Sequence, residues 1–261
     1  MTNFKLNVFN LLPYMKLALT AFFVLTFNCY CFSQSSKLFR IEETIVTDTL
    51  HKKKSSDFTR ENQNLFEDDN YVVRKTCSGE WGGTIWFKNK RTGIVRSCSA
   101  TCPVIVNKLN GKYIITATLN HLSGFSQIIE IDNPELLTIF KLPKPRKKNG
   151  KTLLRYVGDD ESRSTQGSKV ILDTTRVSTL VSFPLDGRLF HVITDYRKTY
   201  LAEIKNKRFV TIDTLSQKSF WSYDSDVFKT NDGHIIVFFK NEEAEGYLDI
   251  FNHEIHIIQY R

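Results

Sequence analysis

A short turn signal recurs four times along the chain and constrains its fold more than any other feature. The four copies read Asn110-Gly111-Lys112, Asn149-Gly150-Lys151, Asp186-Gly187-Arg188 and Asp232-Gly233-His234. Asn-Gly and Asp-Gly pairs adopt positive φ at little cost, and they match the twist of the strands beside a tight hairpin. The glycines are 39, 37 and 46 residues apart, and a period near 40 residues is typical of a four-stranded propeller blade.

The sequence around the turns repeats as well. The most apolar strands follow three of the turns, at Tyr113–Leu119, Leu189–Thr194 and Ile235–Phe239. Adjacent apolar residues within a strand indicate that both of its faces are covered. We interpret the unit at Gly150 as degenerate, because the polar stretch Asp159–Gly167 delays its matching run.

No stretch keeps a helical period over three turns, whereas short strands occur at regular intervals. This pattern predicts an all-β fold, a propeller-like ring of four or five small antiparallel blades. An N-terminal strand would complete the last blade, and the two candidates are Thr84–Lys88 and Leu38–Val46. The second candidate favours five blades.

Three motif-level stretches resemble β-propeller repeat proteins and uncharacterised exported bacterial proteins of similar size. They are Gly82–Phe87, Cys98–Pro103 and Asn107–Asn120. The resemblance implies a propeller-like scaffold and brings no activity or catalytic residue with it. We expect three parts: a signal peptide at 1–33, an extended segment with a polar linker at 34–70, and the propeller-like domain at 71–261.

The N-terminus has the layout of a secretory signal peptide. A charged stretch ends at Lys16, an apolar run extends from Leu17 to Phe32, and cleavage after Ser33 would start the mature chain at Gln34. The run is short for a membrane-spanning helix, so we expect an exported protein that touches a membrane only if this segment stays uncleaved. A lipid attached to Cys29 is the other alternative.

Export permits disulfides, and three cysteines remain after the signal segment: Cys77, Cys98 and Cys102. The simplest interpretation is one disulfide and one free thiol, with Cys77 joined to either of the others. A metal site is not expected, since the cysteines lack paired spacing and a nearby histidine. We predict no cofactor.

Candidate binding residues lie where the repeat is irregular, because loops on a rigid scaffold commonly carry function. The chain has a net charge of +8, and its densest basic cluster is an exposed loop. We expect an unknown protein or glycan as the partner, and no nucleic acid. The predicted binding residues are Trp81, Lys144, Arg146, Lys147, Lys148, Asp159 and Asp160.

Familiar catalytic motifs are absent from the sequence, so no catalytic residue is predicted. The alternative is a glycosidase-like hydrolase, which needs two carboxylates at a defined separation. Three acids occupy equivalent repeat positions and would have to converge: Glu130, Glu203 and Asp249. The competing interpretation is that each acid pairs with a basic or hydroxyl group of a neighbouring blade. His191, within an apolar run, is expected to be a hydrogen-bonded core residue.

Overall fold

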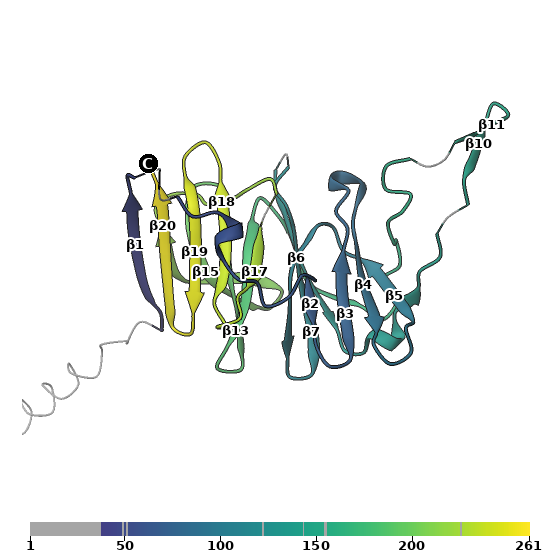
Figure 1. The fold of residues 1–261 in the computed structure, drawn as a ribbon, viewed down its shortest axis with the longest axis horizontal. Helices are drawn as coiled ribbons and strands as arrows, with labels where there is room; N and C mark the ends of the chain where they lie inside the picture. The colour runs from purple at the N-terminus through teal and green to yellow at the C-terminus, as the bar shows by residue number, and fades with distance from the viewer. Residues whose placement is uncertain are drawn as a thin grey trace, which may run out of the picture. The chain divides into compact units, whose positions relative to one another are not determined.

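Strands and short turns make up the fold (Figure 1). The computed structural model describes residues 38–261 except 49, 51, 122, 143, 154, 155 and 225. These residues contain no α-helix, only single 3-10 turns at Ser55–Asp57, Gly79–Trp81 and Pro134–Leu136. The all-β prediction is therefore confirmed. The predicted signal peptide and its cleavage position lie outside the described residues.

Four sheets share one plan, in which four consecutive antiparallel strands pair in chain order. Sheet 1 contains β2 (Phe66–Glu67), β3 (Tyr71–Lys75), β4 (Thr84–Asn89) and β5 (Val95–Ser99), with β9 (Thr138–Ile139) added beside β5. Sheet 2 contains β6 (Pro103–Leu109), β7 (Lys112–Leu119), β8 (Phe125–Ile131) and β12 (Lys169–Thr175).

Sheet 3 contains β13 (Ser178–Leu185), β14 (Arg188–Thr194), β15 (Thr199–Lys205) and β16 (Arg208–Ser216). Sheet 4 contains β17 (Val227–Lys229), β18 (Ile235–Lys240), β19 (Glu245–Phe251) and β20 (Glu254–Tyr260). Strand β1 (Arg40–Val46) pairs in parallel with β20 (Figure 1). Of the two candidates for the added strand, the structure thus uses the one within Leu38–Val46, while Thr84–Lys88 lies within sheet 1.

Three of the four turn glycines are equivalent. Gly111, Gly187 and Gly233 each join the first two strands of a sheet. Asn110 and Gly111 both have positive φ, at 50° and 79°, as a type I′ hairpin requires.

Gly150 is different, and its interpretation as a degenerate unit is wrong. It joins β10 (Arg146–Lys148) to β11 (Lys151–Leu153), a separate two-stranded hairpin that projects from the sheets in Figure 1. This hairpin belongs to an insertion between β8 and β12. The corresponding turn of sheet 1, between β2 and β3, has no glycine, and its residues are Asp69 and Asn70.

The core lies between the sheets. Ile115 of β7 packs with Val73, Ile85 and Phe87 of sheet 1. Its neighbour Ile114 belongs to a second cluster that includes residues of sheet 3. Successive residues of a strand point to opposite faces, so sheet 2 is covered on both sides as its apolar run predicts.

One disulfide joins Cys77 to Cys102, and Cys98 is a buried free thiol. This confirms the prediction of one bridge and one free cysteine and selects between the two pairings that were open. Burial raises the pKa of the Cys98 thiol to about 12, so this thiol is inert at neutral pH.

Candidate functional site

The loops of the four sheets gather at one end of the strands. Each sheet turns from its second to its third strand at this end, through residues 76–83, 120–124, 195–198 and 241–244. The connections between successive sheets, at 100–102, 176–177 and 217–226, lie at the same end because strand direction alternates. We call this the loop end. The tight hairpins at Gly111 and Gly187 lie at the opposite end.

A cavity of about 740 Å³ opens between first strands of three sheets. Its walls come from β2, β6 and β17, together with the segment 60–65 and the end of β3. We call it the charged cavity, because its lining includes four cations and four acids: Arg60, Arg74, Lys75, Lys229, Glu61, Glu67, Asp224 and Asp226.

Arg60 and Asp226 form the best-defined pair in this cavity. The Arg60 guanidinium donates to both carboxylate oxygens of Asp226, at 2.8 and 3.0 Å, and also to Ser55 Oγ at 2.6 Å. Its central carbon lies 4.1 Å from the centroid of the Phe228 ring. The ion pair with Asp226, made through one guanidinium nitrogen, and the stacking on Phe228 together restrain this arginine.

Lys75 is a cation of this cavity that remains available to a ligand. Among the described residues, no hydrogen bond or ion pair reaches its ammonium, and the side chain is exposed to the solvent of the cavity. The surrounding walls nevertheless lower the pKa of Lys75 by burial, while the carboxylates of Asp224 and Asp226 act in the opposite direction. Asn62 Oδ1 in the same lining is buried without a hydrogen-bond partner in the described structure.

Aromatic rings cluster at the loop end. Tyr196 follows β14, and Trp221 and Tyr223 lie on the connection from sheet 3 to sheet 4. The Trp221 ring makes edge-to-face contacts with Tyr196 and Tyr223, with centroids 5.9 and 4.9 Å apart. Tyr223 is 74% exposed, which is unusual for a large aromatic side chain.

The predicted binding residues do not form one site. Trp81 is 65% exposed in the 3-10 turn of the loop end. Asp159 and Asp160 lie in the insertion, where Gly158 packs against Trp81. The basic residues Lys144, Arg146, Lys147 and Lys148 instead lie on or beside the projecting hairpin (Figure 1).

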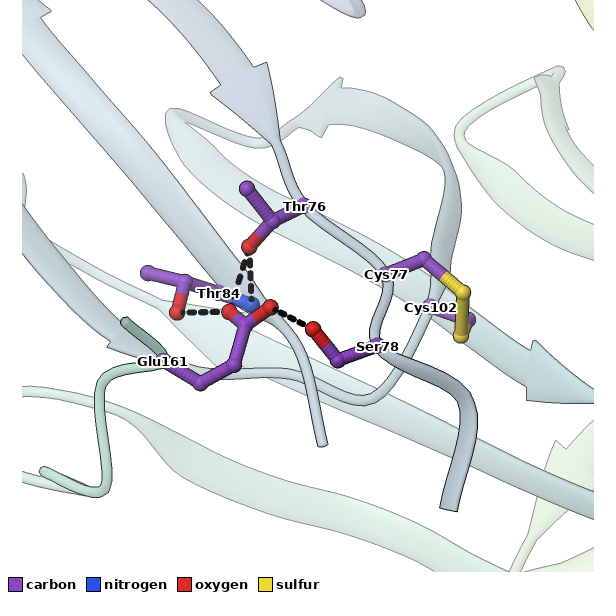
Figure 2. The surroundings of a disulfide bond; sticks show 6 residues. All are labelled: Thr76, Cys77, Ser78, Thr84, Cys102 and Glu161. Atoms are coloured by element: carbon purple, nitrogen blue, oxygen red, sulfur yellow. Dashed lines mark hydrogen bonds between the residues drawn. A yellow bond between two sulfur atoms is a disulfide. The ribbon is translucent and has the colours of Figure 1, made fainter. Parts of the chain in front are cut away.

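Glu161, next to these acids, is buried rather than solvated. It is 8% exposed and accepts hydrogen bonds from three hydroxyl groups (Figure 2). Ser78 Oγ donates at 2.6 Å, Thr84 Oγ1 at 2.5 Å, and Thr76 Oγ1 also donates. The acidic stretch Asp159–Glu161 is therefore not solvated along its whole length. This side chain fastens the insertion to the loop that carries Cys77.

The three repeated acids pair with basic side chains of their own sheets. Glu130 lies 3.1 Å from Lys112, Glu203 lies 2.6 Å from Arg188, and Asp249 lies 2.6 Å from His234. Each of these basic residues directly follows a turn glycine. The hydrogen bond from Arg188 is the main cause that lowers the pKa of Glu203. The acids therefore have basic partners as expected, although the partner lies in the same sheet rather than a neighbouring one.

His191 is a core residue without the expected hydrogen bonds. It is 1% exposed, its ring lies 5.4 Å from that of Phe209, and neither ring nitrogen has a partner in the described residues. Burial lowers its pKa to about 3. The imidazole is therefore neutral at physiological pH.

Comparison of the chain with protein-family models, curated proteins and solved structures found no match. Within the described part of the chain, no group of three or more ligand-type side chains is arranged to hold a metal ion. No helix in that part has the length and apolar character needed to cross a membrane. The described residues contain the Cys77–Cys102 disulfide, and disulfides persist mainly in oxidising compartments.

Sequence reasoning missed both the charged cavity and the Glu161 cluster. The cavity residues come from four separated stretches of the chain, and the Glu161 partners lie 77 to 85 positions away from it. The one available signal was the density of Ser and Thr around Cys77. Hydroxyl groups there would need an acceptor if the loop were covered.

Proposed function

We propose that this chain is an exported, non-catalytic binding protein that holds its ligand in the charged cavity and among the neighbouring loops. The observation that carries this proposal is the composition of the cavity. Its volume of about 740 Å³ falls within the range of about 300–1,000 Å³ that ligand sites occupy. Charged and amide side chains line it, and Lys75 and Asn62 retain unused bonding capacity.

The sheets would be blades of a propeller-like ring. Support comes from the apolar clusters that join sheet 1 to sheet 2 and sheet 2 to sheet 3, and from the first strands that share the cavity wall. Near sheet 4, the isolated backbone bridge from Arg60 to Thr230 holds the segment that precedes sheet 1 against the residue that follows β17. A crystal structure with four sheets around one axis would fit this proposal, and an open stack would contradict it.

Export is supported by the disulfide and by the charged-then-apolar N-terminal sequence. Mass spectrometry of the protein recovered outside the cytoplasm provides the test. A mature chain that starts at Gln34 supports export with cleavage. A chain recovered only from the cytoplasm, with Met1 or Thr2 at its start, would contradict it.

Binding is better supported than glycoside hydrolysis. A hydrolase acid must keep its proton near neutral pH, which requires a raised pKa. In the charged cavity the pKa of Glu67 is instead lowered, chiefly by the hydrogen bond from Lys90, and Asp226 is held by Arg60. Glu130, Glu203 and Asp249 have basic partners of their own.

A variant pair tests the binding proposal on an array that combines glycans, amino acids and short peptides. Lys75→Met with Asp224→Asn alters the cavity, whereas Lys88→Met with Asp173→Asn makes the same changes at exposed positions elsewhere. We expect the wild type and the surface control to bind the same compounds, and the cavity variant to bind them at least tenfold more weakly. A wild type that binds nothing, or a cavity variant equal to it, would refute the proposal.

A further inference from the structure

The aromatic cluster at the loop end is built as a fixed surface. We call Tyr196, Trp221 and Tyr223 the aromatic platform. Its rings meet edge to face, and the outermost ring, Tyr223, is the most exposed. Edge-to-face packing fixes the relative orientation of the rings, and an exposed aromatic surface on a folded protein commonly marks a binding site.

Asn120 holds two parts of the platform at once. This side chain comes from sheet 2 and is 6% exposed. Its Nδ2 donates to the Ser222 carbonyl at 2.6 Å, and its Oδ1 accepts from the Tyr196 hydroxyl at 3.0 Å. Ser222 lies between Trp221 and Tyr223, and its Oγ accepts from Lys240 N at 2.8 Å. The platform is therefore fixed from both neighbouring sheets.

The backbone at Tyr196 is strained to place its ring. Tyr196 has φ of 65°, in the left-handed region that bulky residues avoid. Gly124 makes room for the hydroxyl, because a Cβ at that position would lie 1.9 Å from it. Strained conformations persist where surrounding contacts impose them, often at functional sites.

The chain leads from the platform to residues that line the charged cavity. Asp224 and Asp226 follow Tyr223 in the chain and line the cavity wall. An apolar surface beside hydrogen-bonding side chains matches a sugar ring, which has C–H faces and hydroxyl edges. The four cations of the cavity are balanced by four acids, so the site has no net charge that would select a charged ligand.

We propose that the aromatic platform and the mouth of the charged cavity bind a neutral oligosaccharide, with one sugar ring stacked on Tyr223 and the next hydrogen-bonded to Asp224. This inference rests on the proposed binding function and names its ligand class. Stacking against an aromatic ring excludes water from the sugar face, while the carboxylate accepts hydrogen bonds from the hydroxyls. Because the platform is already ordered, binding loses little conformational entropy.

Titration calorimetry with neutral hexasaccharides of glucose, xylose and N-acetylglucosamine tests the proposal. We expect at least one to bind, with Tyr223→Ala weakening it at least tenfold and Tyr223→Phe changing it less than threefold. Tyr156→Ala removes another exposed tyrosine and serves as the matched control. Trp221 fluorescence should shift on binding in the wild type, and circular dichroism should show that each variant is folded.

Three results would overturn this inference, and in each case the broader binding proposal is still tested separately. If no hexasaccharide binds at millimolar concentration, the ligand class is wrong, while the array experiment with the Lys75 and Asp224 changes still decides whether the cavity binds anything. If a hexasaccharide binds equally to the wild type and to folded Tyr223→Ala, the platform is not the site. Loss of affinity in Tyr156→Ala equal to that in Tyr223→Ala would also count against it.

Discussion

Removal of the Cys77–Cys102 disulfide should destabilise the fold. The expected loss of stability follows from the sequence separation of the two cysteines. The two cysteines are 25 residues apart in sequence. In the chain-entropy description, a cross-link of that span restricts the unfolded chain by about 3.5 kcal/mol at 25 °C. The compact unit Arg40–Arg261 has an unfolding entropy of about 0.5 kcal/mol/K at this size. The expected fall in Tm is therefore about 7 °C.

Thermal melts followed by circular dichroism provide the assay, with Cys77→Ser/Cys102→Ser compared with the wild type. Adding reductant should lower the Tm of the wild type to that of the variant and leave the variant unchanged. Buried Cys98 should stay unmodified by iodoacetamide in both folded proteins.

The same variant should loosen the insertion, because Thr76 and Ser78 flank Cys77 and both donate to Glu161. Hydrogen exchange should rise in residues 156–168 more than in sheet 3. A Tm change below about 2 °C, or equal exchange in both regions, would refute the view that the disulfide fixes the loop that fastens the insertion.

Three further predictions concern buried or partly buried ionisable groups. Glu161→Ala should lower the free energy of unfolding in urea by about 3 kcal/mol, because three hydroxyl donors lose their acceptor. Asp160→Ala, at an exposed position, should lower it by less than about 0.5 kcal/mol. Equal losses would contradict a stabilising role for the hydrogen bonds to Glu161. Lys75 should react with cyanate faster at pH 7.5 in Asp226→Asn than in the wild type. The lost carboxylate favours the charged amine, so its removal lowers the pKa of Lys75 further. Peptide mass spectrometry would measure the reaction, and a slower reaction in the variant would disprove the prediction. Because the folded-state pKa of His191 is depressed to about 3, the unfolded chain binds the extra proton below about pH 6.5, so stability should fall by up to about 1.4 kcal/mol per unit as pH drops towards 4. His191→Leu should remove that slope in acid-side urea titrations, and an unchanged slope would exclude His191 as its source.

The scaffold was predictable where local chemistry decides it. The Asn110-Gly111 pair must form a tight turn, and the apolar run after it must be covered on both faces, because both properties depend on nearby residues. The same reasoning failed at Gly150, since Asn-Gly forms a hairpin equally well in an insertion and between the strands of a sheet. The repeated Asn-Gly and Asp-Gly turns did not reveal sheet 1, because Asp69 and Asn70 form its first turn without a glycine.

The candidate site was less predictable because distant residues assemble it. Lys75 and Asp226 line the charged cavity from positions about 150 residues apart, and neither has an unusual sequence neighbourhood. Trp81 was recognised as a candidate by its irregular loop. The position of Tyr223 depends instead on the hydrogen bond from Asn120 to the neighbouring Ser222. The sequence period does not predict this contact.

The parallel pairing of β1 with β20 has a consequence for how the protein is made. Arg40 pairs with Glu254, so β1 leaves the ribosome about 10–40 s before its partner at synthesis rates of about 5–20 residues per second. During that interval β1 is an unpaired strand that another chain could capture. Its three charged residues, Arg40, Glu42 and Glu43, oppose such capture by charge repulsion and hydration. The strand that completes sheet 4 can therefore remain unpaired until β20 has been synthesised.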